Sequence, residues 1–166
     1  MRTLLAVLLA LGTASQVLGK VARIPFEELV RQSDLIVVAK VSSVTRPLIG
    51  KKYAKANVTE VWKGASQEAV RFLASPTWTC DSSTAQKGET FVLFLIEDKK
   101  THAYQISGEG RGRMPIRTAG SKPYASFWSE IIFPKYIPTT DEPGFTQAVE
   151  LVELRKLVNS SMQTGK

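Results

Sequence analysis

Cysteine and histidine are almost absent from this sequence: among its 166 residues there is one of each, Cys80 and His102. A single cysteine cannot form a disulfide within the chain, so packing alone has to hold the fold together. One histidine and one cysteine also cannot complete a closed tetrahedral zinc site, which usually takes four such ligands. We therefore expect neither a disulfide framework nor a metal or other cofactor.

His102 is the only residue that could act as the base of a Ser-His-Asp site. It follows the turn signal Lys99-Lys100, and a solvent-facing turn residue is the simplest interpretation of it. The spacing of Cys80 and His102 gives no support to a catalytic dyad. We predict no catalytic residue, and hence a protein that is not an enzyme. The sequence leaves three roles open for Cys80: a buried apolar residue, a partner in an intermolecular disulfide, or a reactive thiol.

Long apolar runs are missing after the first residues, and no later segment approaches the roughly 18 apolar residues of a membrane-spanning helix. At the start of the chain a basic residue precedes an apolar stretch at residues 4–11, and small residues follow it. This pattern is typical of a signal peptide spanning residues 1–19, with cleavage after Ala14 or after Gly19. We expect a secreted or periplasmic protein without a transmembrane segment, in which residues 20–166 form a single domain.

The strongest element in the sequence is a strand at residues 89–96. Residues 91–96 are all apolar and rich in Phe, Val and Ile. The turn signal Lys87-Gly88 precedes this run, and the acidic pair Glu97-Asp98 ends it. A short apolar run with such boundaries indicates a strand that is buried on both faces.

Four further strands are predicted, at residues 35–44, 53–62, 69–74 and 103–106. A brief edge strand is expected at residues 114–116, because its proline lacks a ladder donor, and another strand at residues 126–133. In the strand at residues 53–62 the apolar phase slips by one residue between Val58 and Val61. A β-bulge produces such a slip, and bulges bend strands so that a sheet can close into a barrel.

Helices are predicted only near the two ends of the chain. The first spans residues 24–32, with Phe26, Leu29 and Val30 on one face that should dock on the sheet. The second spans residues 147–162 and carries an apolar stripe of Val149, Val152, Leu154, Leu157 and Val158. Together the elements indicate a mainly β fold with flanking helices, namely an OB-fold-like β-barrel that is closed or partly open.

The formal net charge of +7 favours anionic partners, although solubility alone also accounts for it. The densest basic cluster is formed by Arg111, Arg113 and Arg117. With Lys122, these residues are candidates for binding an anion or an acidic partner. The alternative is a solvated loop without a ligand.

Trp78 and Cys80, in a polar loop after Pro76, are further binding candidates. Trp78 is a large aromatic residue and is a candidate for lining an exposed binding edge. OB-folds can stack nucleic-acid bases on such aromatic side chains. An exported protein seldom meets single-stranded nucleic acid, however, so we expect no nucleic-acid partner. Packing in the core or at its rim is the alternative role for such aromatic residues.

The order of the strands, with the short motifs that end them, resembles a known family over residues 26–110. The motifs are Asp34-Leu35-Ile36-Val37-Val38-Ala39-Lys40-Val41, Val61-Trp62-Lys63-Gly64, Val70-Arg71-Phe72-Leu73, Pro76 to Cys80, and Lys87-Gly88-Glu89-Thr90-Phe91-Val92-Leu93-Phe94-Leu95. This sequence resembles the netrin-like module shared by tissue inhibitors of metalloproteinases, netrins and exported bacterial proteins. The resemblance implies an OB-fold barrel. The inhibitors of this family chelate the protease zinc through a Cys-x-Cys at the mature N-terminus, and no cysteine lies near Ser15 or Lys20.

The leading hypothesis is therefore an exported, non-enzymatic binding domain whose partner is another protein or an anionic envelope component. One alternative is metalloendopeptidase inhibition through a surface other than an N-terminal cysteine. A second alternative is a thiol-dependent protein that uses Cys80. A third is the binding of anionic polymers through the cluster of Arg111, Arg113, Arg117 and Lys122.

Overall fold

The structure, a computed structural model, describes residues 22–45, 50–77, 81–134 and 147–163. The predicted signal peptide, Trp78 and Cys80 lie outside these residues. The strands are β1 (Ile24–Pro25), β2 (Leu35–Val44), β3 (Tyr53–Lys63), β4 (Ala69–Leu73), β5 (Thr90–Asp98), β6 (Ala103–Ile106), β7 (Arg113–Ala119), β8 (Lys122–Ser126), β9 (Ile131–Ile132) and β10 (Ala148–Glu150), and the helices are α2 (Phe26–Gln32) and α3 (Leu151–Gln163). Neither of these two helices has the length and hydrophobicity that crossing a bilayer requires.

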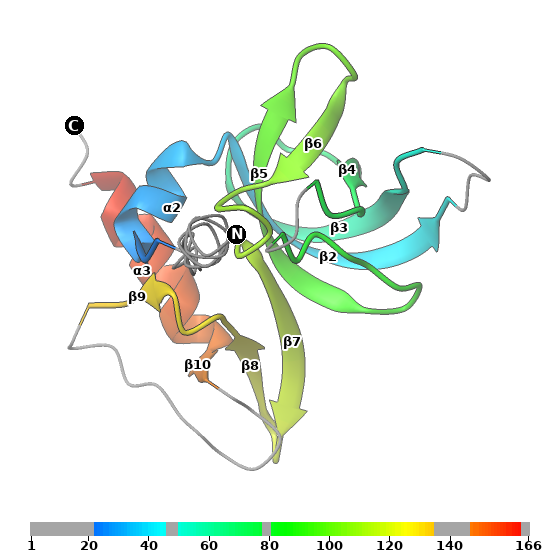
Figure 1. Ribbon diagram of the computed structural model, residues 1–166. Helices are drawn as coiled ribbons and strands as arrows, with labels where there is room; N and C mark the ends of the chain where they lie inside the picture. The colour runs from blue at the N-terminus through cyan, green and yellow to red at the C-terminus, as the bar shows by residue number, and fades with distance from the viewer. Residues whose placement is uncertain (1–21, 46–49, 78–80, 135–146, 164–166) are drawn as a thin grey trace, which may run out of the picture.

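Five strands close into a barrel, which confirms the predicted mainly β, OB-like fold (Figure 1). Around the barrel the order is β2–β3–β4–β6–β5, and β5 pairs again with β2. Neighbouring strands are antiparallel except β4 and β6, which are parallel. In a five-stranded Greek-key barrel a closed ring leaves few strand edges exposed to solvent.

β5 is buried on both faces, as its apolar run predicts. Phe91, Leu93 and Leu95 point into the barrel and join the inner core. Val92 and Phe94 point outward and join a second core beneath the helices. A strand alternates its side chains between two faces, so a continuous apolar run is required where both faces are covered.

The two helices form the layer that covers the outer face of β2 and β5, and they lie side by side in Figure 1. Phe26, Leu29 and Val30 of α2 are all buried, as predicted. The ring of Phe26 meets that of Phe94 edge-on, with 5.7 Å between the ring centroids. From α3, the buried residues are Leu154, Leu157 and Val158. The predicted stripe is wrong at Val152, which is 57% exposed.

A β-bulge interrupts the pairing of β2 and β3 where the apolar phase slips. Val38 pairs with Glu60, whereas its neighbour Ala39 pairs with Val58, so Thr59 has no partner of its own. An unpaired extra residue bends the strand and increases its twist. The bulge predicted from the sequence is therefore confirmed, and it lies in a strand of the closed barrel.

The prediction of an edge strand at residues 114–116 is wrong, because β7 has partners on both sides. Pro115 pairs with Phe91 of β5, and Ile116 pairs with Ala125 of β8. The prediction rested on the missing N–H of Pro115. The β8 ladder begins only at Ile116, so this proline interrupts no described pairing with β8.

Two element boundaries near the C-terminus also differ from prediction. In place of one strand at residues 126–133 there are β8 and the two-residue β9, which pairs with β1. Phe127 and Ile131 are both buried. Phe127 lies in the connection between the two strands, and Ile131 begins β9 after a turn in which its N–H donates to Trp128 O at 3.0 Å. The predicted helix starts at Leu151 rather than at residue 147, because residues before it pair with β8 as β10.

Candidate functional site

A cleft of about 510 Å³ lies beside the barrel where three stretches of chain meet. The stretches are the segment around β1, the connection from β4 to β5, and β6 with the loop that follows it. Residues from all three, together with α2 and β5, line the cleft: Ala22, Arg23, Ile24, Pro25, Glu28, Gln32, Leu73, Thr77, Asp81, Ser83, Ile96, Gln105, Ile106, Gly108, Glu109 and Arg111. The cleft is therefore a product of the tertiary fold.

Arg111 holds the β1 segment against the loop at residues 107–112. Its side chain is 9% exposed. Nη1 donates a hydrogen bond to Ala22 O, and Nε donates to Gly108 O at 2.7 Å. Nη2 pairs with the carboxylate of Glu109 at 2.9 Å. A planar guanidinium with several donors can bridge such separate acceptors in one fixed geometry.

The loop at residues 107–112 leaves the edge of β5 and returns to it. Phe94 accepts from Ser107 N–H at 2.8 Å and donates its own N–H to Gly112 O at 2.9 Å. At the tip, Gly110 has φ +86°, and a Cβ there would lie 2.7 Å from Asp81 Oδ1. Only glycine combines this backbone conformation with so close an approach. This glycine-rich stretch therefore forms a turn.

Asp81 organises the part of the cleft lining that lies against the tip of this loop. Its Oδ2 accepts from Thr77 N–H at 2.7 Å and from Thr77 Oγ1 at 2.8 Å, and its Oδ1 accepts from Ser83 N–H at 2.8 Å. Burial alone would raise the pKa of the Asp81 carboxyl. The hydrogen bonds from Ser83 and Thr77 outweigh burial and hold its pKa below the ordinary value.

Apolar side chains complete the lining of the cleft. Ile96 is 37% exposed, although it extends the buried run of β5. Leu73 and Ile106 lie beside it in the lining and are almost fully buried. The cleft thus offers an exposed apolar side chain within a frame that hydrogen bonds already hold in place. Sites of this composition suit the binding of an apolar group with fixed polar contacts around it.

The predicted basic cluster is not one exposed patch. Arg111 is committed to the cleft. Arg113 has a 14% exposed side chain, pairs with Glu89 at 3.5 Å, and lies over the Phe91 ring at 4.3 Å. Burial lowers the pKa of Arg113, and Glu89 opposes this effect. Arg117 is exposed on β7, and Lys122 on β8 pairs with Glu150 at 2.6 Å. The fold therefore uses Arg111 and Arg113 for internal contacts.

Other residues considered from the sequence have simpler positions. As predicted, His102 is exposed in the turn between β5 and β6. Its φ is 51°. Within the described ranges, no group of three or more His, Cys, Asp or Glu side chains is arranged to hold a metal ion.

Asp81 and Ala22 were not identified from the sequence. A local signal was available for Asp81, since an Asp two residues before the N–H that it accepts is typical of an Asx turn. No local signal connects Ala22 with Arg111. Neither a family model nor a curated protein in the comparisons matches this chain.

Proposed function

We propose that this protein is an exported, non-enzymatic binding domain of the netrin-like type, and that a partner protein docks in the cleft beside the barrel. The observation that carries the proposal is the exposed Ile96 within a prearranged polar frame. Arg111 and Asp81 each satisfy several hydrogen bonds before any partner arrives. A site that needs little ordering loses less free energy on binding.

The chemistry of the cleft indicates what the partner should present. Ile96 offers an apolar contact, and Leu73 and Ile106 also line the cleft. Glu109 on the rim has a side chain that is 52% exposed. An extended peptide segment with an apolar residue next to a basic one complements these groups. Interface energy usually concentrates in such a central apolar contact with polar groups at the rim.

Site-specific photocrosslinking in the secreted or periplasmic fraction tests this proposal. A photoreactive phenylalanine analogue replaces Ile96 in the cleft or, as a control, Val152 on α3, which is more exposed. We expect a discrete adduct from position 96 only. An excess of wild-type protein without the photoreactive residue should prevent formation of this adduct, whereas an excess of the Ile96→Asp variant should not. Repeated absence of an adduct from position 96, or the same adducts from both positions, would count against the cleft.

Inhibition of a zinc endopeptidase is a second candidate, and the place of the β1 segment favours it. This segment lies on the rim of the cleft, where Arg111 holds Ala22. The netrin-like resemblance implies that the start of the domain contacts a protease. A panel of zinc endopeptidases assayed at micromolar protein tests the idea, with Ile96→Asp as the comparison. Unchanged protease rates throughout the panel would remove this candidate and leave the docking proposal standing.

A further inference from the structure

Three segments around β2, β3 and β4 carry cations but no carboxylate. Residues 40–45, 50–59 and 69–77 contain five basic residues, Lys40, Lys51, Lys52, Lys55 and Arg71, and no acidic one. All five are exposed. None of them takes part in an ion pair among the described residues. Cations elsewhere, such as Arg31 and Lys156, pair with nearby carboxylates. No ion pair among the described residues therefore neutralises the positive charge of these three segments.

Strand register brings two of these charges close together. Lys55 of β3 pairs directly with Arg71 of β4. Like charges opposite each other in a sheet repel, and no carboxylate relieves this repulsion. Arg71 makes a compensating contact with Tyr53: its guanidinium lies 4.0 Å from the centroid of the Tyr53 ring. A bound anion would relieve the repulsion, so this face of the folded protein favours an anionic ligand.

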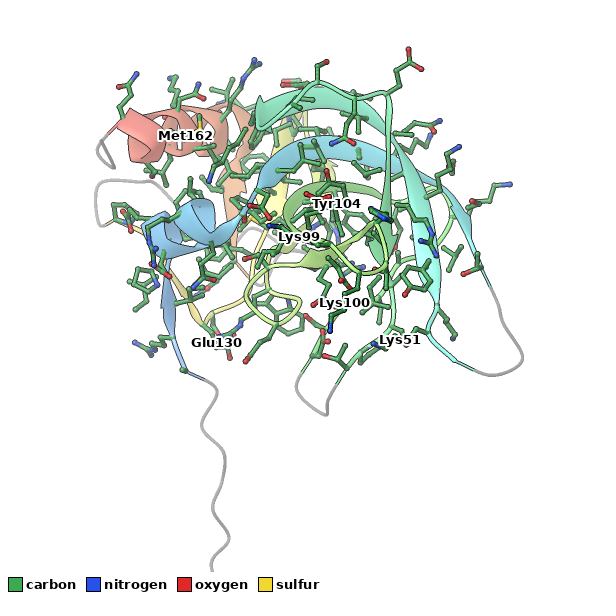
Figure 2. All side chains as sticks on the ribbon, turned by 90° about the horizontal axis from the view of Figure 1, so that it is seen from above. Lys51, Lys99, Lys100, Tyr104, Glu130 and Met162 are labelled. Atoms are coloured by element: carbon green, nitrogen blue, oxygen red, sulfur yellow. The ribbon has the colours of Figure 1, made fainter. Side chains whose placement is uncertain are left out.

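A polar groove of about 880 Å³ continues this face at the end of the barrel. Its lining includes Lys52, Lys87 and the hydroxyl-bearing residues Ser42, Ser43, Ser75 and Thr84, and no acidic residue is among the described residues that line it. The Ser42 hydroxyl already donates to Lys55 O at 3.0 Å. The nearest acid in sequence, Glu89, is already occupied: it accepts from Gln86 N–H and pairs with Arg113. Figure 2 shows Lys51 at this hairpin end of the barrel and Met162 of α3 on the opposite side of the molecule.

We propose that this basic groove, together with the adjoining face of β2, β3 and β4, binds a linear anionic polysaccharide with sulfate or carboxylate groups. Lysine side chains supply charge, and hydroxyl groups can donate to sulfate or carboxylate oxygens and to sugar hydroxyls. The cations follow the curve of the barrel and continue into a groove. A flexible chain can follow that track, whereas a flat bilayer surface contacts only part of it.

Single-stranded nucleic acid fits the groove less well. Proteins that bind it without sequence preference stack the bases on several exposed aromatic rings. On residues 40–45, 50–59 and 69–77 the only aromatic residues are Tyr53 and Phe72. Phe72 is fully buried, and Arg71 already covers one face of the Tyr53 ring. This inference is independent of the proposed cleft, since it concerns a different surface and a different class of partner.

Heparin, a linear sulfated polysaccharide, is the probe that tests the proposal, with neutral dextran as the blank. The variant Lys52→Glu/Lys87→Glu reverses both groove lysines. The matched control, Lys99→Glu/Lys100→Glu, makes the same charge change in the exposed turn between β5 and β6 (Figure 2). We expect the groove variant to weaken heparin binding by about tenfold or more and the control to change it by less than about threefold. A neutral variant, Lys52→Gln/Lys87→Gln, should lie between wild type and the reversal.

Several outcomes would overturn the proposal. Equal losses in the groove and control variants would mean that only net charge matters. Heparin binding that does not weaken with added salt would exclude an electrostatic groove. Binding of phosphatidylserine vesicles, or of single-stranded DNA, in preference to heparin would assign the face to a different class of partner. Circular dichroism and the melting temperature of each variant establish that it is folded, and Ile96→Asp should leave heparin binding unchanged.

Discussion

Arg111 donates a hydrogen bond to the carbonyl oxygen of Ala22, a residue 89 positions earlier in the chain. The same side chain binds Gly108 O and the carboxylate of Glu109. One buried guanidinium therefore ties the β1 segment to the loop after β6 and forms one wall of the candidate cleft. The Arg111 contacts show how a residue predicted to bind an external anion is instead used within the fold.

Replacing Arg111 by Ala should release the β1 segment as well as destabilise the protein. The substitution removes the side-chain donor to Ala22 O and to the Glu109 carboxylate, and leaves Gly108 O with only the backbone N–H of residue 111 as its donor. We expect a cost of about 1–3 kcal/mol in the free energy of unfolding. Hydrogen exchange should show the earliest loss of protection at Ile24 N–H, which now donates to Glu130 O at 2.9 Å. Lys99→Ala, in an exposed turn, is the control. Unchanged exchange at Ile24 in the Arg111→Ala variant would contradict this role.

Two glycines with positive φ should respond differently to alanine. At Gly110 a Cβ would meet Asp81 Oδ1 and the backbone nitrogens of Ser82 and Ser83, each at 2.7 Å. At Gly120, with φ +60°, a Cβ would meet nothing within 4 Å. Gly120→Ala should cost about 1 kcal/mol for the left-handed backbone alone. Gly110→Ala should cost at least about 2 kcal/mol more. Chemical denaturation measures both, and equal costs would show that the loops at Gly110 and Asp81 separate easily.

Acid should weaken the rim that Asp81 organises. Because hydrogen bonds from Ser83 and Thr77 hold the folded-state pKa of Asp81 below its ordinary value of about 4, the carboxylate stabilises the folded state above that pH. This contribution is lost as the pH falls from about 4 through the lower folded-state pKa. The free energy of unfolding of Asp81→Asn should therefore fall less steeply below about pH 4 than that of wild type. Glu97→Gln, which removes an exposed carboxylate, serves as the control. The prediction would be refuted if the free energy of unfolding of Asp81→Asn and of wild type depended on pH in the same way below about pH 4.

Neighbouring positions of α3 provide a matched test of the outer core. Leu154 is fully buried beneath the helix, whereas Val152 is 57% exposed. Leu154→Ala should lower the free energy of unfolding by about 2–5 kcal/mol, because it leaves a cavity between α3 and the barrel. Val152→Ala should change it by no more than about 0.5 kcal/mol. Thermal or urea denaturation distinguishes the two, and similar costs at both positions would mean that α3 packs in another orientation.

Much of the barrel was predictable because its pattern is local. The apolar run at residues 91–96 indicated a strand with two covered faces, and the phase slip before Val61 indicated the bulge. The face of α2 that carries Phe26, Leu29 and Val30 followed from helical periodicity. Side-chain direction repeats with a fixed period in strands and helices. Burial of one face therefore places apolar residues at that period in the sequence.

The irregular parts of the outer core were predicted less well. Phe127 is apolar and buried, yet it lies in a connection between strands, and Val149 is buried in β10 rather than in a helix. These positions are apolar because they are buried. The backbone conformation at each of them depends on pairing with a segment that is distant in the sequence. β10 exists because β8 offers an edge to it, and β7 is an inner strand because β5 and β8 both pair with it.

By itself the sequence determined the class of fold, the central strand, the bulge and the excess of positive charge. Only the tertiary structure decided which cations remain exposed. Arg111 and Arg113, adjacent to Arg117 in the sequence cluster, are drawn into buried contacts, whereas Lys52 and Lys87 meet at one groove from different segments. Charge is a property of each residue, but exposure and proximity depend on long-range strand pairing. The distribution of charge on the surface is for that reason a property of the folded chain.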